Sequence, residues 1–232
     1  MILLENKWAL VTGSSRGIGR QIAMGLAKHR CNVIVHGRTM EHTVETLQKL
    51  KEYPVQTYAV AGDLGTMEGV EAVIQGVRQG PGYVDILYNN AAIQNEFKPI
   101  WEITYEEWLH TFQVNLFAVI ALCNAFAPEM KRRGYGRIIN LSSGIADVPS
   151  LAPYSVSKAA IDKYSRDLAA ELKGTNVLVN YLDPGWLKTD MGGPNAWYPV
   201  ETVLPGALVP ALLEDNGPTG RLFAAQDYKY LD

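Results

Sequence analysis

The distribution of apolar residues predicts alternating strands and helices. Seven short runs are almost entirely apolar, which is typical of strands covered on both faces of a sheet. Between them, apolar residues recur with helical spacing. The expected strands are residues 8–12, 32–36, 55–61, 84–89, 136–141, 176–182 and 221–225. The expected helices are residues 16–29, 40–52, 67–79, 104–132, 153–173 and 201–213.

This alternation predicts βαβ units with right-handed crossovers. Such units build an α/β fold, a doubly wound Rossmann-type sheet of about seven parallel strands flanked by helices. No linker, repeat or low-complexity tract interrupts the pattern. We therefore expect a single domain over residues 1–232.

Composition excludes several classes of function. The 232 residues suffice for one sizeable core, and 47% apolar with 19% charged residues is ordinary for a globular protein. The formal net charge of -3 provides no basic field to attract nucleic acid or anionic lipid. A small-molecule partner is expected instead.

Cysteine and histidine usage argues against a disulfide framework and a metal site. Cys31 and Cys123 lie in apolar segments and are expected to be buried thiols in a reducing compartment. The four histidines lack metal-ligand spacing. The first strand begins at residue 8, which leaves no room for a signal peptide, and the longest plausible apolar run, 116–123, is too short for a membrane span. A cytoplasmic location is expected.

A glycine-rich turn follows the first predicted strand and opens the first helix. Glycine permits the tight turn and lets backbone N–H groups approach a phosphate, while the helix N-terminus supplies free donors. In this context the pattern Gly13-x3-Gly17-x-Gly19 predicts a dinucleotide site. The contacting residues expected from the turn are Gly13, Ser15, Arg16, Gly17, Ile18 and Gly19.

The end of the second strand bears on the choice of dinucleotide. A carboxylate there would accept hydrogen bonds from a ribose 2′-hydroxyl, but residues 33–39 contain no acid. Arg38 offers a charged fork to a 2′-phosphate, and Arg16 offers a second one. The sequence therefore favours NADP(H) over NAD(H), unless Arg38 is merely an exposed loop residue.

Tyr154 and Lys158 are candidates for proton transfer. They are four residues apart, so they share a face of the predicted helix. A nearby ammonium lowers the pKa of a phenol, and a phenol tuned in this way can protonate an alkoxide or accept its proton. A serine hydroxyl at the end of the fifth strand would hold the substrate oxygen nearby. Spacing alone does not decide between Ser142 and Ser143 for that role.

The ordered set of motifs resembles the classical short-chain dehydrogenase/reductase family over essentially the whole chain. The set comprises Thr12-Gly13-x3-Gly17-x-Gly19, Asp63-Leu64, Asn89-Asn90-Ala91-Ala92, Asn115, Ser143, Tyr154-x3-Lys158 and Pro184-Gly185-Trp-Leu-Lys-Thr189. The segments Gly217-Pro-Thr-Gly220 and Thr189-Asp-Met-Gly-Gly-Pro194 resemble the carbonyl-reductase-like branch. That branch implies reduction of aldehydes and ketones.

The resemblance implies a role for each matching residue. Asp63 and Leu64 would meet the adenine, Asn90 and Ala91 would follow the cofactor ribose, and Lys158 would grip the nicotinamide ribose beside Tyr154. After the turn at Pro184 and Gly185, the cofactor would meet Leu187 and Thr189. The catalytic residues implied are Asn115 as a water-holding proton relay, Ser143 rather than Ser142, Tyr154 and Lys158.

The sequence also departs from the family pattern. The interval between Ser143 and Tyr154 is a residue or two shorter than usual, which predicts a tight loop over the substrate. Too few residues follow Met191 for a long lid helix, so we expect a short substrate loop at about 186–200. The expected substrate-binding residues are Gln94, Ser143, Ile145, Tyr154, Trp186 and Met191. The alternative interpretation is that Trp186 and Trp197 only pack the loop against the sheet.

These features predict an NADP(H)-dependent carbonyl reductase with Tyr154 as general acid. An NAD(P)+-dependent alcohol dehydrogenase working in the oxidative direction is the alternative within enzymes. A non-catalytic NADP(H)-binding sensor would not require Ser143, Tyr154 and Lys158 together. Apolar residues on several faces of helices 104–132 and 153–173 favour a homodimer or homotetramer.

Overall fold

The computed structural model describes residues 4–231 and contains the predicted doubly wound sheet. Seven parallel strands lie in the order β3-β2-β1-β4-β5-β6-β9. The direction of winding reverses between β1 and β4, which are paired through Ala9 and Ile86. The strands are β1 (Trp8–Val11), β2 (Asn32–Gly37), β3 (Thr57–Ala61), β4 (Ile86–Asn89), β5 (Gly136–Leu141), β6 (Val177–Asp183) and β9 (Leu222–Ala224).

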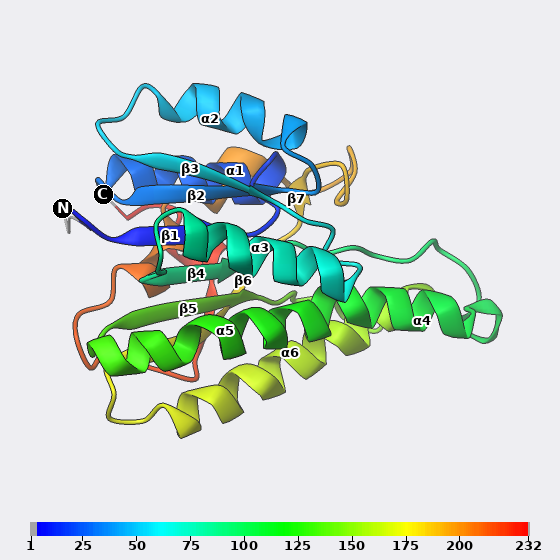
Figure 1. Ribbon diagram of the computed structural model, residues 1–232. Helices are drawn as coiled ribbons and strands as arrows, with labels where there is room; N and C mark the ends of the chain where they lie inside the picture. Colours follow the sequence, from blue (N-terminus) through cyan, green and yellow to red (C-terminus); the bar gives the residue numbers. More distant parts are fainter. Residues whose placement is uncertain (1–3, 232) are drawn as a thin grey trace.

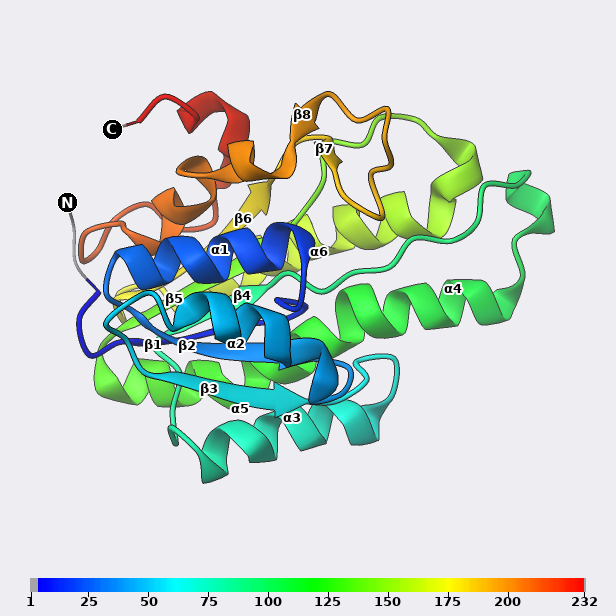
Figure 2. The same ribbon diagram turned by 90° about the horizontal axis from the view of Figure 1, so that it is seen from above.

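Helices cover both faces of this sheet (Figure 2). On one face lie α1 (Gly17–Lys28), α2 (Val44–Leu50) and the 3₁₀ segments η5 (Val200–Val203) and η6 (Gly206–Ala211). On the other lie α3 (Met67–Gln79), α5 (Ala118–Arg133) and α6 (Ala152–Glu171). Neighbouring strand residues contribute to opposite cores, which explains why the strands are apolar throughout. The short 3₁₀ turns η1 (Glu41–Thr43), η2 (Ile100–Glu102), η4 (Pro149–Leu151) and η7 (Ala225–Tyr228) lie in the connections.

The predicted helix 104–132 is present but is not uniform. It consists of α4 (Tyr105–Phe112), a π-helical turn η3 (Gln113–Phe117) and α5. Thr104 and Glu107 form a capping box at its start, where each satisfies a backbone N–H of the other. Single π-helical turns inside helices often mark functional sites, and this one contains Asn115.

The same helical run has the length and composition of a membrane span. Residues Tyr105–Arg133 form 29 helical residues with a window of mean hydropathy 1.5, which corrects our expectation that no apolar segment approaches that length. That window is 44% buried inside the protein, where α5 packs against the sheet. A buried core helix meets the same criterion, so this one run within residues 4–231 is weak evidence for a membrane span.

The predicted helix 201–213 is wrong. The chain there forms η5 and η6, both 3₁₀, and Pro205 and Pro210 explain the difference. Proline lacks a backbone donor and disfavours the helical conformation of the residue before it. The sequence also gave no sign of the two-residue strands β7 (Leu187–Lys188) and β8 (Tyr198–Pro199), which pair with each other beside the main sheet.

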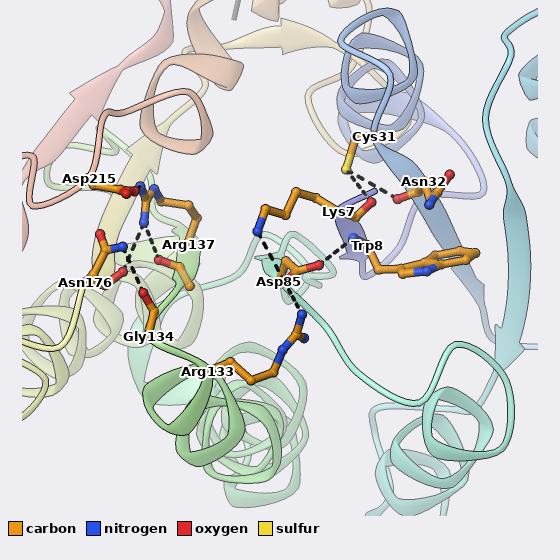
Figure 3. Close-up of polar contacts among 11 residues, drawn as sticks. Lys7, Trp8, Cys31, Asn32, Asp85, Arg133, Gly134, Arg137, Asn176 and Asp215 are labelled. Carbon is orange, nitrogen blue, oxygen red and sulfur yellow. Dashed lines mark hydrogen bonds and ion pairs between the residues drawn. The ribbon is translucent and has the colours of Figure 1, made fainter. Parts of the chain in front are cut away.

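A network of ion pairs closes the amino end of the sheet (Figure 3). The Asp85 carboxylate, only 1% exposed, lies 3.1 Å from Arg133 and 4.0 Å from Lys7. It also accepts a hydrogen bond of 2.9 Å from the backbone of Trp8. The equally buried Arg137 pairs with Asp215 at 3.1 Å and donates to three backbone carbonyls. These contacts join β1, α5, β5 and the segment before β9.

Both cysteines are buried free thiols, as predicted. Burial raises the pKa of the Cys123 thiol to about 12 and also raises the pKa of Cys31, so both stay protonated at neutral pH. Among residues 4–231, no group of three His, Cys, Asp or Glu side chains is arranged to hold a metal ion.

Candidate active site

The candidate site lies at the carboxyl end of the parallel strands. In Figure 1 this end of the sheet is on the side of the view that contains β7 and α4. Ligands of open α/β sheets bind at this edge, close to the point where the strand order reverses. The predicted catalytic and cofactor residues come from the connections after these strands and from the helices that follow them.

Two positions of the glycine turn have no room for a side chain, because neighbouring atoms of the protein lie close to them. Gly13 has a φ of +63°, and a Cβ there would lie 3.0 Å from the Ala91 Cα. A Cβ on Gly19 would lie 2.5 Å from both the Asn90 amide nitrogen and the Gly13 carbonyl oxygen. The extended Arg16 precedes α1 and makes no side-chain cap. The N–H groups in the first turn of α1 are therefore free to bind a pyrophosphate.

Thr12 and Asn90 join the turn after β1 to the turn after β4. The Thr12 hydroxyl oxygen accepts hydrogen bonds from the backbone of Asn90 at 2.9 Å and of Ala91 at 3.0 Å. The Asn90 side chain donates to the Thr12 carbonyl at 2.8 Å. The Asn90 side chain therefore holds the glycine turn in place, and its amide nitrogen is engaged by the protein backbone.

His36, at the end of β2, also supports the glycine turn. Its Nδ1 accepts from the Gly13 backbone N–H at 2.9 Å, so its Nε2 carries the proton and donates to the Gly62 carbonyl at 3.0 Å. Its backbone N–H donates to the Ser14 hydroxyl at 3.0 Å. Burial lowers the pKa of His36 to about 4, so the ring is neutral at physiological pH.

The adenosine end of the candidate site presents exposed polar groups. Arg38 is exposed directly after β2, whereas Arg16 pairs with Asp190 at 3.0 Å. Asp63 is exposed, and one of its carboxylate oxygens accepts from the Gly65 backbone at 2.9 Å. Leu64 is buried in the core against α3 and α5, so its side chain faces away from this surface.

The proton-transfer residues converge as the spacing predicts. Lys158 is buried, its Nζ lies 5.6 Å from the centre of the Tyr154 ring, and it donates to the Leu141 carbonyl at 2.7 Å. Burial lowers the pKa of Lys158 to about 8. Burial raises the pKa of Tyr154 and a hydrogen bond with Ser143 opposes this rise, so the net lowering expected from a nearby ammonium is not found. The phenol is protonated at neutral pH.

The two candidate serines face different partners. Ser142 is buried and its hydroxyl donates to the Asp162 carboxylate at 2.5 Å. Ser143 is partly buried, hydrogen-bonds with Tyr154 and accepts from the Ile145 backbone at 3.2 Å. Strand alternation thus sends Ser142 toward α6 and leaves Ser143 at the candidate site.

Asn115 uses both ends of its amide to fix the segment that follows β4. Its oxygen accepts from the Ile93 backbone at 2.9 Å, and its nitrogen donates to the Ile93 carbonyl at 2.8 Å and to the Ser157 hydroxyl at 3.0 Å. Ser157 immediately precedes Lys158 on α6. Asn115 therefore links α6, which carries Tyr154 and Lys158, to the segment that follows β4.

The segment after β6 approaches the glycine turn. Gly185, with a φ of +82°, donates to the Asp183 carboxylate at 2.9 Å, and the Pro184 carbonyl accepts from Gln226 at 3.0 Å. The Leu187 side chain is buried in the core. The methyl group of Thr189 would lie 3.6 Å from a Cβ on Gly17.

Several predicted substrate residues meet in this segment. Gln94 donates to the Met191 carbonyl at 3.4 Å, and the Trp186 indole donates to the Gly192 carbonyl at 2.8 Å. Trp197 packs edge-on against Trp186, with ring centres 5.6 Å apart, yet remains 72% exposed. Ile145 lies apart from this group, beside Ser143.

Sequence reasoning missed three supporting residues: Thr12 as a hydrogen-bonding group, His36 and Asp162. The sequence could have indicated Asp162, because it is four residues after Lys158 and eight after Tyr154 and so shares their face of one helix. The indication for His36 was weaker: it is a polar residue at the end of an apolar strand. No local pattern revealed the contact between Thr12 and the segment after β4.

Comparison with known proteins agrees with this arrangement. A model of the family described as short chain dehydrogenase matches residues 7–196. The chain is 38% identical over 189 residues to dehydrogenase/reductase SDR family member 4 of Sus scrofa, covering 81% of this chain and 68% of that protein. It is 32% identical over 190 residues to 5-keto-D-gluconate 5-reductase of Escherichia coli (strain K12), covering 81% and 74%.

A solved structure extends the similarity to the whole chain. A putative NAD(P) dependent gluconate 5-dehydrogenase from Beutenbergia cavernae, with bound NADP, superposes with a TM-score of 0.85 and 28% identity over 99% of both chains. This chain therefore belongs to the short-chain dehydrogenase/reductase family of oxidoreductases, which bind a nicotinamide cofactor and act on hydroxyl or keto groups.

Proposed function

We propose that the protein is an NADP(H)-dependent reductase of an aldehyde or ketone, of the carbonyl-reductase-like type. The observation that carries this proposal is the convergence of the Tyr154 phenol, the Ser143 hydroxyl and the Lys158 ammonium at the sheet edge that also bears the glycine turn. Each group has a distinct task in reducing a carbonyl, and a protein that only binds a dinucleotide needs none of the three together.

The residues around the glycine turn fit a dinucleotide. The N–H groups at the start of α1 have no capping side chain and would bind the pyrophosphate, next to the close-packed turn that Gly13 and Gly19 allow. Asp63 and the backbone of Leu64 would meet the adenine, and Lys158 and the segment 90–91 would meet the riboses. The turn at Pro184 and Gly185 would bring Leu187 and Thr189 to the nicotinamide half. When bound, NADPH supplies the hydride that the carbonyl carbon receives.

Tyr154 acts as the general acid in this proposal. Its raised pKa keeps the phenol protonated, which is the state needed to protonate the oxygen of a carbonyl under reduction. Ser143 holds that oxygen through a hydrogen bond. Lys158, with Asn115 and a bound water, returns a proton to Tyr154 after each turnover.

Arg38 is the proposed determinant of NADP(H) preference. It is exposed at the end of β2 and no acidic side chain follows in residues 39–40, while Asp190 engages Arg16. A guanidinium fork binds a phosphate strongly, so Arg38→Ala should lower the ratio of NADPH to NADH affinity by at least about tenfold. Fluorescence titration with both cofactors measures this ratio. Arg30→Ala removes an arginine at the opposite end of the sheet as the control.

The loop at 186–200 is the proposed substrate loop. Gln94 donates there to the Met191 carbonyl and Trp186 donates to the Gly192 carbonyl, and the two indoles would offer an apolar wall to a substrate. Ser143, Ile145 and Tyr154 would form the opposite wall. The loop is short, so we propose an open site that accepts carbonyl compounds of varied size.

The alternative function is an NAD(P)+-dependent alcohol dehydrogenase working in the oxidative direction. One relative described above is named as a reductase and another as a dehydrogenase, so the family supports either direction. The protonated phenol favours reduction, because oxidation needs Tyr154 to accept a proton. A non-catalytic NADP(H) sensor is a third function, and it predicts binding without turnover.

A homodimer or homotetramer is proposed for the assembled protein. Exposed apolar side chains line the long helix and α6, which pack against each other: Tyr105, Leu109, Phe117 and Val156. A second copy of this chain would cover them. Sedimentation of a single 25.6 kDa species would contradict this assembly. The two buried, unpaired thiols suit a reducing cytoplasm.

The decisive experiment is a screen of cofactor oxidation with varied aldehydes, ketones and quinones, using NADPH and NADH in parallel. We expect oxidation with several carbonyl compounds and a preference for NADPH. The reverse reaction with NADP+ and alcohols, measured at several pH values, tests the alternative direction. NADPH binding with no turnover across the screen would support the sensor and contradict the reductase.

A further inference from the structure

The end of β5 is fastened to α6 through two consecutive residues. The Leu141 carbonyl accepts from the Lys158 Nζ at 2.7 Å, and the Ser142 hydroxyl donates to the Asp162 carboxylate at 2.5 Å. The next residue along the chain is Ser143, which hydrogen-bonds with the catalytic phenol. The position of Ser143 is therefore set by contacts immediately before it in the chain.

The residues on the α6 side of this contact follow a helical repeat. Tyr154, Lys158, Asp162 and Arg166 are four residues apart and share one face of α6. Asp162 thus lies one turn from Lys158 and carries a charge of opposite sign. Lys158 is 4% exposed, and its one hydrogen bond described above is to a neutral carbonyl. A buried ammonium needs a nearby negative charge more than an exposed one does.

We propose that Asp162 and Ser142 form a positioning pair for the reaction: their hydrogen bond fixes the backbone ahead of Ser143, and the Asp162 carboxylate keeps the neighbouring Lys158 ammonium charged. This inference rests on the function proposed above. Neither residue touches the reacting atoms. Each acts through its neighbour, Ser142 through Ser143 and Asp162 through Lys158.

The charges around the pair determine the direction in which the pKa of Lys158 should move when Asp162 is substituted. Burial lowers the pKa of Lys158 to about 8, and the Asp162 charge opposes that lowering. Burial raises the pKa of Asp162, while Ser142, Arg166 and Lys158 lower it and Asp183 of β6 raises it. Asp162 is ionised in the alkaline range where Lys158 titrates. Removing its charge lets Lys158 lose its proton at a lower pH.

Two substitutions separate the two roles. Asp162→Asn keeps an oxygen that accepts from Ser142 but removes the charge. Ser142→Ala removes the hydrogen bond but keeps the charge. Asp167→Asn is the matched control, because Asp167 is an exposed carboxylate on the same helix, paired only with Lys163 among its described contacts.

The measurements are kcat and kcat/KM against pH, using the best carbonyl substrate from the screen. For Asp162→Asn we expect the alkaline decline to begin about one pH unit lower than in the unsubstituted protein. For Ser142→Ala we expect kcat to fall about tenfold at every pH, because Ser143 is misplaced, with no shift of the decline. Asp167→Asn should reproduce the unsubstituted profile.

NADPH fluorescence titration from pH 6 to 10 provides a readout independent of turnover. If Lys158 grips the cofactor as an ammonium, the affinity of Asp162→Asn should decline at a lower pH by the same shift. Unshifted profiles in both assays would overturn the electrostatic role, as would an equal shift in Asp167→Asn. Full kcat in Ser142→Ala would overturn the positioning role. Absence of turnover in the unsubstituted protein would instead count against the proposed function, and the binding titration would still test the pair.

Discussion

The two ends of the parallel sheet differ in the partners of their buried charged groups. At the amino end, the buried Asp85 and Arg137 each have a partner of opposite charge within 3.1 Å (Figure 3). At the carboxyl end, the buried Lys158 has a carbonyl as its hydrogen-bond partner, and the exposed Arg38 follows β2. The first helix also begins there without a capping side chain.

The difference separates groups that hold the fold together from groups that are available to ligands. A buried charge with its partners in place is costly to disturb and has no capacity left for a ligand. Uncapped N–H groups and an ammonium whose hydrogen bond is to a neutral carbonyl retain that capacity. Substitutions at the amino end should therefore change stability, and those at the carboxyl end should change binding or rate.

Tyr154→Phe should have the largest effect. It removes the proton donor and keeps the ring, so kcat should fall by about 10²–10⁴ while the Kd for NADPH changes little. Steady-state kinetics and fluorescence titration measure the two quantities. Tyr135→Phe removes a phenol at the amino end and should leave both unchanged. Full activity of Tyr154→Phe would rule out its role as general acid.

Asp85→Ala should lower the free energy of unfolding by about 3 kcal/mol, because it leaves Lys7 and Arg133 without their shared partner and the Trp8 N–H without an acceptor. Urea denaturation monitored by fluorescence measures this change. At a temperature where the variant is folded, its KM and kcat should match those of the unsubstituted protein. A large loss of kcat in the folded variant would contradict the division between the two ends.

His36 should make stability depend on pH. Its folded pKa of about 4 lies below the unfolded value of 6.5, so between these values the unfolded chain binds a proton that the native protein does not. The free energy of unfolding should fall as pH drops from about 6.5 to 4, by at most about 3 kcal/mol. Urea titrations at several pH values measure the slope.

His36→Asn should remove that slope, because its amide oxygen can accept from Gly13 without titrating. His42→Asn, at an exposed histidine, serves as the control and should retain the slope. An unchanged slope in His36→Asn would assign the acid sensitivity to other groups.

Gly13→Ala should weaken NADPH binding about tenfold, since its φ of +63° strains alanine and the added methyl meets Ala91. Gly134→Ala imposes the same kind of strain where no atom lies within 4 Å of the added methyl. It should cost about 1 kcal/mol of stability and leave the Kd for NADPH unchanged. Equal affinities in the two variants would mean that the shape of the glycine turn does not control binding.

Particular residues show which features of the fold and the site could be predicted from the sequence. The strands were predictable because a strand buried on both faces is apolar throughout, and the glycine turn was predictable because its pattern is local. Helical spacing placed Tyr154 and Lys158 on one face of a helix, and the serine after the fifth strand together with the ordered set of family motifs indicated their role. The 3₁₀ segments after residue 200 were not predicted, because the apolar residues there recur with helical spacing while Pro205 and Pro210 prevent a regular α-helix.

The sequence by itself determined the order of the elements, the glycine turn and the residue types available for proton transfer, all of which depend on neighbours within a few positions in the chain. Only the tertiary structure decided that Ser142 faces Asp162 while Ser143 meets Tyr154, and that His36 supports Gly13. These contacts join residues 11 to 23 positions apart. Which groups meet at such distances depends on how helices pack on a twisted sheet, and burial then sets their charge.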